Sequence, residues 1–147
     1  MPEGVHGPAK NESYLTAIRT RGSDANPFFR LMGISVADIS EGRAELSMTV
    51  LPMMHNGVGW LQGGMYTALT DEAMALALYT VIDPSERIAT ISESTSFLRG
   101  VREGTIVAVG RVLKRGRRVA FMEGEVRADS EQGEILARST AAFAVIA

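Results

Sequence analysis

Two adjacent acidic residues, Asp71 and Glu72, stand in a segment that is otherwise apolar, residues 63–78, directly after a glycine-rich polar stretch. At helical spacing, the residues three and four positions from either acid are mainly apolar, so neither acid continues a polar face. Buried carboxylates are costly unless they are paired or hydrogen-bonded. We therefore interpret at least one acid as a working carboxylate, the alternative being exposure of one acid at a helix edge. Asp71 is preferred because its neighbours on the helix are small and leave room for a ligand: Thr67, Ala68 and Ala75.

This arrangement is suited to the hydrolysis of an activated carbonyl. Glycines at a helix N-terminus offer backbone N–H groups that can donate hydrogen bonds to a developing oxyanion. A carboxylate further along the helix can activate water as a general base, or it can attack the carbonyl directly. Partial burial would raise the pKa of Asp71 above its usual value of about 3.9 and make it a stronger base. The sequence leaves both mechanisms open.

The composition argues against several other functions. The 147 residues include no cysteine, which rules out disulfides, thiolate catalysis and cysteine-ligated metals. With only His6 and His55 we expect no metal site. The formal net charge of -2 argues against nucleic acid as a partner. The sequence shows neither a signal-peptide pattern nor an apolar run long enough to span a bilayer, so we expect a cytoplasmic protein without a membrane partner.

Three helices are predicted. A short one, capped at residues 11–13, belongs to an N-terminal lead-in segment over residues 1–25, of which about the first ten are expected to be flexible. A second short helix over residues 27–32 ends at Gly33. The long helix that carries the two acids spans about residues 63–81.

Alternating apolar and polar residues predict six strands separated by turn signals. They cover residues 34–39, 43–50, 88–98, 105–114, 117–128 and 134–145. The last three are joined by tight turns and must form an antiparallel meander. The expected fold is α+β, a single domain over residues 26–147 in which an antiparallel sheet of about six strands wraps round one long helix.

In their order and spacing these pieces resemble the hotdog-fold acyl-coenzyme A thioesterases, specifically the phenylacetate-pathway (PaaI-like) type. The resemblance spans about residues 26–146, and the segments that carry it are residues 26–34, 56–57, 63–64 with Asp71, 97–104 and 133–137. It implies a hotdog fold and hydrolysis of an acyl-CoA thioester to the free acid and CoA. Coenzyme A would enter as part of the substrate, and no separate cofactor is expected.

The resemblance also implies roles for single residues. Asp71 matches the catalytic carboxylate, and Gly63 matches the glycine whose backbone N–H polarises the thioester carbonyl. Asn56 matches an amide that helps hold the thioester, and Thr90 matches a hydroxyl that in some members orients water from the neighbouring subunit. Gln62 stands where the family usually has histidine. Because glutamine forms hydrogen bonds but cannot titrate, we expect re-tuned activity and not its loss.

Further candidate substrate contacts are Gly64, Trp60, His55, Arg99, Lys114, Arg115 and Arg117. The basic residues suit the phosphates of coenzyme A, but a run of charges at a hairpin tip is more often a solvated turn. His55 has a structural loop role as its alternative reading. Trp60 could line an acyl pocket or belong to the core. The same two interpretations apply to Phe28, Phe29, Met32, Met53, Met54 and Leu61. Gly100, where the family commonly has proline, is expected to affect a turn only.

We expect a homodimer or homotetramer, because one sheet on one helix would leave apolar strand positions uncovered, among them Ile106, Ala108, Val119 and Phe121. Asp71 of one subunit would then face Asn56, Gly63 and Thr90 across the interface. Two rival functions stay open. A non-catalytic acyl-CoA-binding module is favoured by Gln62, and a hotdog dehydratase or hydratase would use His55 and Asp71.

Overall fold

Short helices at the N-terminal side pack onto the core of the domain. The computed structural model describes residues 12–147, so the prediction of a flexible start lies outside the described residues. Helix α1 (Tyr14–Arg21) begins at Ser13, whose hydroxyl accepts a hydrogen bond from the backbone N–H of Thr16, and buries Ala17 and Ile18. A 3-10 turn, η1 (Gly22–Ala25), follows it.

Helix α2 (Pro27–Met32) matches its prediction in full. The side chain of Asn26 caps it by accepting a hydrogen bond from the N–H of Phe28 at 3.0 Å. Gly33 ends it with a φ of 68°, a left-handed conformation that glycine adopts without strain.

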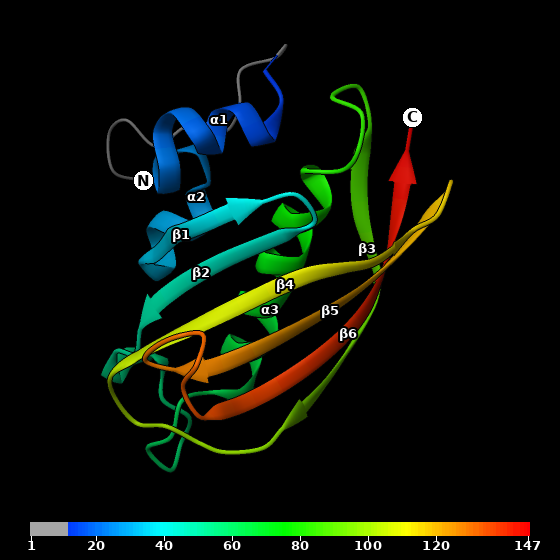
Figure 1. Ribbon diagram of the computed structural model, residues 1–147. Coiled ribbons are helices and arrows are strands. Elements are labelled where there is room, and N and C mark those ends of the chain that lie inside the picture. The colour runs from blue at the N-terminus through cyan, green and yellow to red at the C-terminus, as the bar shows by residue number, and fades with distance from the viewer. Residues whose placement is uncertain (1–11) are drawn as a thin grey trace.

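One antiparallel sheet forms the body of the fold. Its strands are β1 (Ile34–Ser40), β2 (Arg43–Thr49), β3 (Arg87–Phe97), β4 (Thr105–Arg115), β5 (Val119–Ala128) and β6 (Ile135–Ile146). The six strands lie in the order β1-β2-β4-β5-β6-β3, which confirms the meander of the last three. Strand β3 precedes β4 in the chain but pairs with β6, so it forms one edge of the sheet (Figure 1).

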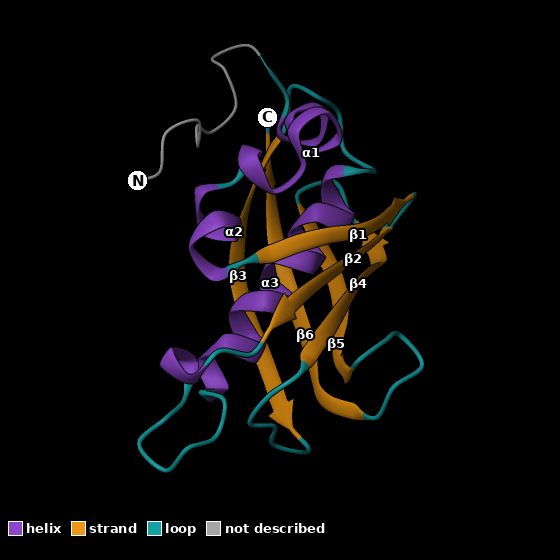
Figure 2. Ribbon diagram, turned by 90° about the vertical axis from the view of Figure 1, so that its left-hand side faces the viewer, coloured by secondary structure: helices purple, strands orange, loops and turns teal. Residues whose placement is uncertain are grey.

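The long helix α3 (Gly63–Tyr79) lies across the concave face of the sheet, as Figures 1 and 2 show. This is the predicted α+β hotdog fold. The helix comes very close to β4 at Gly110, where an added Cβ would stand 2.5 Å from the backbone of Ala73. A glycine is therefore required there to seat α3. Among residues 12–147, no helix has both the length and the apolarity needed to cross a membrane.

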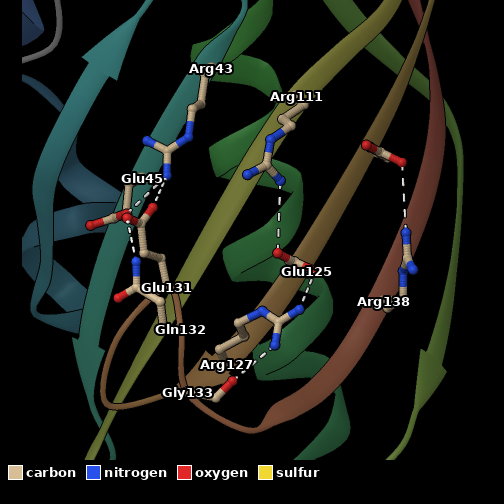
Figure 3. A network of polar contacts seen from close by, with 10 residues as sticks. Arg43, Glu45, Arg111, Glu125, Arg127, Glu131, Gln132, Gly133 and Arg138 are labelled. Carbon is tan, nitrogen blue, oxygen red and sulfur yellow. Dashed lines mark hydrogen bonds and ion pairs between the residues drawn. The ribbon is translucent and has the colours of Figure 1, made fainter.

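The outer face of the sheet carries a network of charged side chains (Figure 3). Arg43 pairs with Glu45 at 3.2 Å and also with Glu131, while Arg127 pairs with Glu125 at 3.1 Å. In the strand register, Val107 and Val109 of β4 lie opposite residues of this network on the outer face of the sheet. Both valines are buried. Long charged side chains can cover apolar surface in this way.

The expectation that apolar positions of β4 are left uncovered was wrong. Ile106 and Ala108 alternate with the outer-face residues, point to α3, and are 1% and 0% exposed. Phe121 of β5 is 50% exposed, and Val119 is half-buried. Uncovered apolar side chains also occur along the edge strand β3, where Ile91 is 57% exposed. Exposed apolar side chains therefore occur on β5 and along the β3 edge, and not at Ile106 and Ala108 in the middle of β4.

Candidate active site

Asp71 lies in the middle of α3, where the helix faces strand β3. Its carboxylate accepts a hydrogen bond from the hydroxyl of Thr90 at 2.9 Å. Burial raises the pKa of Asp71, and the hydrogen bond from Thr90 opposes part of that rise. Sequence reasoning placed Thr90 across a subunit interface from Asp71. That placement was wrong, because both residues belong to one chain and are bonded to each other.

Glu72, the second acid, points to a different environment. Its carboxylate accepts a hydrogen bond from the side-chain amide of Asn26 at 3.4 Å and lies beside Tyr14 and Tyr79. Burial, followed by repulsion from Asp71, raises the pKa of Glu72 from 4.5 to about 7. Neither acid is a solvent-facing helix residue, since both side chains are partly buried.

A row of polar pairs joins α3 to β3, and we call it the polar seam. Its three pairs are Thr67 with Thr95 at 3.2 Å, Thr70 with Glu93 at 2.8 Å, and Asp71 with Thr90 at 2.9 Å. The hydroxyl of Ser139 on β6 also contacts the seam, 3.1 Å from the hydroxyl of Thr70. Sequence reasoning missed all of these residues except Asp71 and Thr90. A signal was present, because residues 92–96 are polar at both inward and outward positions of a strand.

The N-terminus of α3 is open to a ligand. Gln62 precedes the helix, is exposed, and makes no side-chain capping bond, while its backbone N–H donates to Met54 at 2.9 Å. Gly63 is the first helical residue, and an added Cβ there would lie 3.4 Å from the ring of Phe97. The first N–H groups of a helix have no intrahelical acceptor and carry the positive end of the helix dipole. A carbonyl oxygen can therefore be polarised here.

The loop before α3 is held by Asn56 and His55. The side-chain oxygen of Asn56 accepts hydrogen bonds from the N–H groups of Val58 at 3.0 Å and Trp60 at 3.1 Å. The Nε2 of His55 lies 2.7 Å from the carbonyl oxygen of Arg102. Both residues thus shape the loop. The side-chain oxygen of Asn56 is occupied by these bonds, so its side-chain NH2 group would be the part left to contact a thioester.

Trp60 lies against a second loop and gives Gly100 a role. The guanidinium of Arg102 stands 4.0 Å from the centre of the Trp60 ring, a cation–π contact. A Cβ at Gly100 would be 3.1 Å from the same ring. The expectation that Gly100 affects only a turn was therefore incomplete, because its lack of a side chain makes room for the indole.

The candidate phosphate-binding residues have different surroundings. Arg115 forms two 2.8 Å bonds to Glu86, and Arg99 pairs with Glu134, so both have structural ion pairs. Lys114 and Arg117 are exposed at the β4–β5 hairpin tip. That tip lies at the far end of the sheet from the N-terminus of α3 (Figure 1). Within one chain, the fold does not bring the hairpin-tip residues to Gly63, whereas Arg99 lines the same pocket as Gly63.

An apolar pocket opens beside Gln62 on the other side of the α3 N-terminus. It has a volume of about 370 Å³, and methionines form most of its wall: Met32, Met53, Met54 and Met65, with Leu31, His55 and Gln62. Met53 is 87% exposed at its mouth. Other residues considered for an acyl pocket belong to the core, among them Phe29 and Leu61. Flexible methionines suit apolar ligands of variable shape.

Two parts of the candidate site are separated within one chain. Gly63 and Asp71 lie eight positions apart on α3, which at 1.5 Å per residue is about 12 Å along the helix. A thioester carbonyl held at Gly63 is therefore out of reach of the carboxylate of the same chain. Both groups nevertheless border β3, Gly63 at Phe97 and Asp71 at Thr90.

Comparison with known proteins identifies the family. The chain belongs to the thioesterase superfamily, which matches residues 59–135. A "Putative esterase" of Deinococcus radiodurans is 34% identical over 121 residues, covering 81% of this chain and 79% of that protein. A 1,4-dihydroxy-2-naphthoyl-CoA hydrolase of Listeria monocytogenes is 22% identical over 111 residues, covering 76% of this chain and 90% of that protein.

Solved structures confirm the hotdog fold. A mutant thioesterase from Pseudomonas aeruginosa has a TM-score of 0.78 at 25% identity, covering 87% of this chain and 91% of that one. A "putative thioesterase, phenylacetic acid degradation-related protein" from Ralstonia eutropha has a TM-score of 0.79 at 24% identity, covering 89% of this chain and 98% of that one. The prediction of a hotdog fold is thus confirmed.

Proposed function

We propose that this protein hydrolyses acyl-CoA thioesters to the free acid and CoA. The observation that carries the proposal is the partly buried carboxylate of Asp71, held by Thr90 on the face of α3 that borders β3. A thioester is a reactive electrophile, so one oxyanion donor and one base suffice. The backbone N–H of Gly63 takes the first role, and Asp71 takes the second, as general base or as nucleophile.

The decisive test is the Asp71→Asn variant, which keeps the shape of the side chain and removes the base. We expect turnover to fall by about 10² to 10⁴, the usual worth of general-base help, with binding largely kept. Thiol release would be followed with butanoyl-, decanoyl-, phenylacetyl- and 1,4-dihydroxy-2-naphthoyl-CoA. Glu125→Gln, on the outer face of the sheet, is the matched control and should keep wild-type turnover. Near wild-type turnover in Asp71→Asn would refute the assignment.

The separation of Gly63 from Asp71 supports a homodimer with two shared sites. Antiparallel pairing of β3 with β3 of a second copy would continue the sheet through its open edge. The strand has one extra residue at its bulge between Thr90 and Ser92. A pairing centred on Ser94 therefore sets Phe97 of one copy level with Thr90 of the other. Gly63 of one subunit would then meet Asp71 of its partner.

Cysteine cross-linking tests this register, because the chain contains no cysteine of its own. Ser94 is exposed on β3, and two copies of it would face each other across the two-fold axis. Directly paired residues have Cα atoms about 4.5–5.5 Å apart, within disulfide range. Ser94→Cys should give a covalent dimer on mild oxidation. Ser96→Cys, two residues away on the same face, should not, and equal cross-linking of both variants would contradict the register.

The methionine pocket supports an apolar acyl group as the part of the substrate that lies beyond Gln62. Among residues 12–147, His55 is the one titratable side chain in its wall, and the Nε2 of His55 lies 2.7 Å from the carbonyl oxygen of Arg102. A non-catalytic acyl-CoA-binding module is the second candidate function, favoured by glutamine in place of the family histidine at position 62. The two differ in one result, because a binding module would bind these acyl-CoAs without releasing thiol.

A further inference from the structure

A second pocket opens beside Gly63, where the end of β3 passes the N-terminus of α3. It has a volume of about 260 Å³ and is lined by Leu61, Gly63, Tyr66, Phe97, Leu98, Arg99 and Gly100. Much of its wall is apolar, and Phe97 and Leu98 are each 55% exposed. Exposed apolar side chains grouped around a pocket often mark a surface that binds a ligand. The proposed hydrolysis uses Gly63 and leaves the rest of this pocket without an occupant.

Two arginines follow the apolar part of this pocket along the chain. Arg99 lies in the pocket wall, and Arg102 is three residues further on in the same loop. The guanidinium of Arg102 lies 4.0 Å from the centre of the Trp60 ring. In the part of the chain that the structure describes, no carboxylate pairs with Arg102. Its N–H donors are therefore available to an anionic ligand.

The ion pair of Arg99 is weak enough to be exchanged for a ligand. Its partner is Glu134, and the two side chains are 64% and 53% exposed. Exposed ion pairs contribute little to stability, because water and salt screen them. A phosphate group offers a guanidinium the same two-point hydrogen bonding as a carboxylate. A bound phosphate can therefore replace Glu134 at small cost.

Backbone hydrogen bonds fix this loop relative to Gly63. The N–H of Leu61 donates to the carbonyl oxygen of Val101 at 2.9 Å, which joins the loop to the segment that enters α3. The N–H of Leu98 donates to the carbonyl oxygen of Leu136 at 2.8 Å, which joins the loop to β6. The two arginines are thus held near the pocket before a ligand arrives, which lowers the entropic cost of binding.

We propose that Arg99 and Arg102 bind the phosphates of coenzyme A, and that the pocket between them and Gly63 holds its pantetheine arm. The inference rests on the proposed hydrolysis, and it concerns the part of the substrate opposite the acyl group beyond Gln62. The pantetheine arm is a chain of methylene, methyl and amide groups that ends in phosphates. The same order, apolar wall first and arginines second, runs outward from Gly63.

The charges around the arginines favour CoA itself over a thioester carried on an acidic acyl carrier protein. Glu134 contacts Arg99, and Glu103 follows Arg102 in the chain, and both acids are exposed. An acidic protein partner needs a complementary basic surface of some breadth, and these two acids interrupt it. The compact phosphates of CoA need only local donors.

Truncation of the carrier tests the assignment. The fastest acyl group of the four would be compared as its CoA thioester and as its N-acetylcysteamine thioester, which keeps the reacting end of pantetheine and lacks phosphates. We expect Arg99→Gln and Arg102→Gln each to raise KM for the CoA thioester about 3- to 10-fold, with kcat changed by no more than about twofold. The short thioester should be cleaved as by the wild type, which also shows that the variants fold. Arg111→Gln, on the outer face of the sheet, is the matched control and should change neither KM.

Three results would overturn the inference. The first is an unchanged KM for the CoA thioester in the Arg99→Gln/Arg102→Gln double variant. The second is an equal rise in KM for both thioesters, because the phosphates would then have no part in the effect. The third is a higher kcat/KM for the same acyl group on an acyl carrier protein than on CoA.

Trp60 gives an independent measurement, since we assign it the positioning of Arg102. Trp60→Phe keeps an aromatic ring beside the guanidinium and should keep the KM of the wild type for the CoA thioester. Trp60→Ala should raise this KM about as much as Arg102→Gln, and the two changes together should have little more effect than one. Equal KM values for the Phe and Ala variants would contradict this role.

Binding of CoA alone separates this inference from the proposed hydrolysis. Calorimetric titration of the Asp71→Asn protein with CoA should give a Kd that rises about 3- to 10-fold when Arg99→Gln or Arg102→Gln is added. If no acyl-CoA releases thiol, the proposed hydrolysis fails, and this rise in Kd would still support the phosphate site. A Kd for CoA that neither arginine affects would overturn the inference whatever the turnover.

Discussion

Replacing Glu72 with glutamine should flatten the dependence of stability on pH between pH 5 and pH 8. Burial and repulsion from Asp71 raise the pKa of Glu72 from 4.5 to about 7 in the folded protein. Between these two values the folded state holds a proton that the unfolded state has released. The contribution of Glu72 to the free energy of unfolding is therefore largest below about pH 4.5, and it falls as pH rises through this window.

The size of the effect follows from the shift. Each unit of pKa difference is worth about 1.4 kcal/mol, so the full shift corresponds to about 3 kcal/mol of unfolding free energy. Partial exposure of the side chain allows solvent screening, which reduces the expected value to about 1–2 kcal/mol. For a chain of this length that is about 3–8 °C in Tm. The wild type should lose this much between pH 5 and pH 8, relative to Glu72→Gln.

Thermal unfolding in matched buffers at pH 5, 6, 7 and 8 measures the difference. Glu125→Gln is the control. Hydrogen bonding to Arg127 and the nearby arginine charges outweigh burial and keep the pKa of Glu125 below its usual value. Its stabilising effect is therefore lost only as pH falls through that lowered pKa, below the window tested. If wild type and Glu72→Gln showed the same slope between pH 5 and pH 8, the burial of Glu72 would not have the effect described.

Three further substitutions test the helix and its N-terminus. Gly63→Ala places a methyl group 3.4 Å from Phe97, an ordinary contact, so the fold should persist while kcat/KM falls about 10²-fold because the approach to the N–H is obstructed. Gln62→His should change turnover by no more than about tenfold, or 1.4 kcal/mol, and a collapse of activity would contradict the geometry of the loop. Gly110→Ala would put a Cβ 2.5 Å from the Ala73 backbone and should cost about 1–3 kcal/mol in urea unfolding.

Most of the fold could be predicted from the sequence, because local signals mark its elements. Period-two patterns and turn residues located the strands, and caps fixed α2 to the residue. The strand predicted from residue 117 begins at Val119. The turn before it is wider than predicted, since the guanidinium of Arg115 donates a hydrogen bond to the carbonyl oxygen of Arg117. The sequence could not predict which face of β4 meets α3. Ile106 and Val107 point to opposite faces of the sheet, but both are apolar, so the pattern does not distinguish the two faces.

Residues of the candidate site could be singled out from the sequence only where a residue conflicts with its local surroundings. Asp71 stands out in an apolar helix, and Gly63 stands at its start. Ser139, by contrast, is an ordinary residue of an alternating strand, and its contact with Thr70 joins segments that are distant in sequence. Pairing of that kind depends on how β3 and β6 are aligned, which no local pattern encodes.

The composition of β3, an edge strand of the sheet, has a consequence for how readily the chain associates. An exposed edge strand offers unpaired backbone groups to any passing strand and is a common starting point for aggregation. This edge carries serine and threonine at most of its central positions and one inward-pointing acid, Glu93. The centre of this strand has little apolar surface to reward a foreign pairing, although Ile91 and Phe97 are exposed on either side of it, and an inward charge penalises pairing in a shifted register. The exposed serines of this strand and its inward-pointing Glu93 therefore protect the newly folded chain from indiscriminate association.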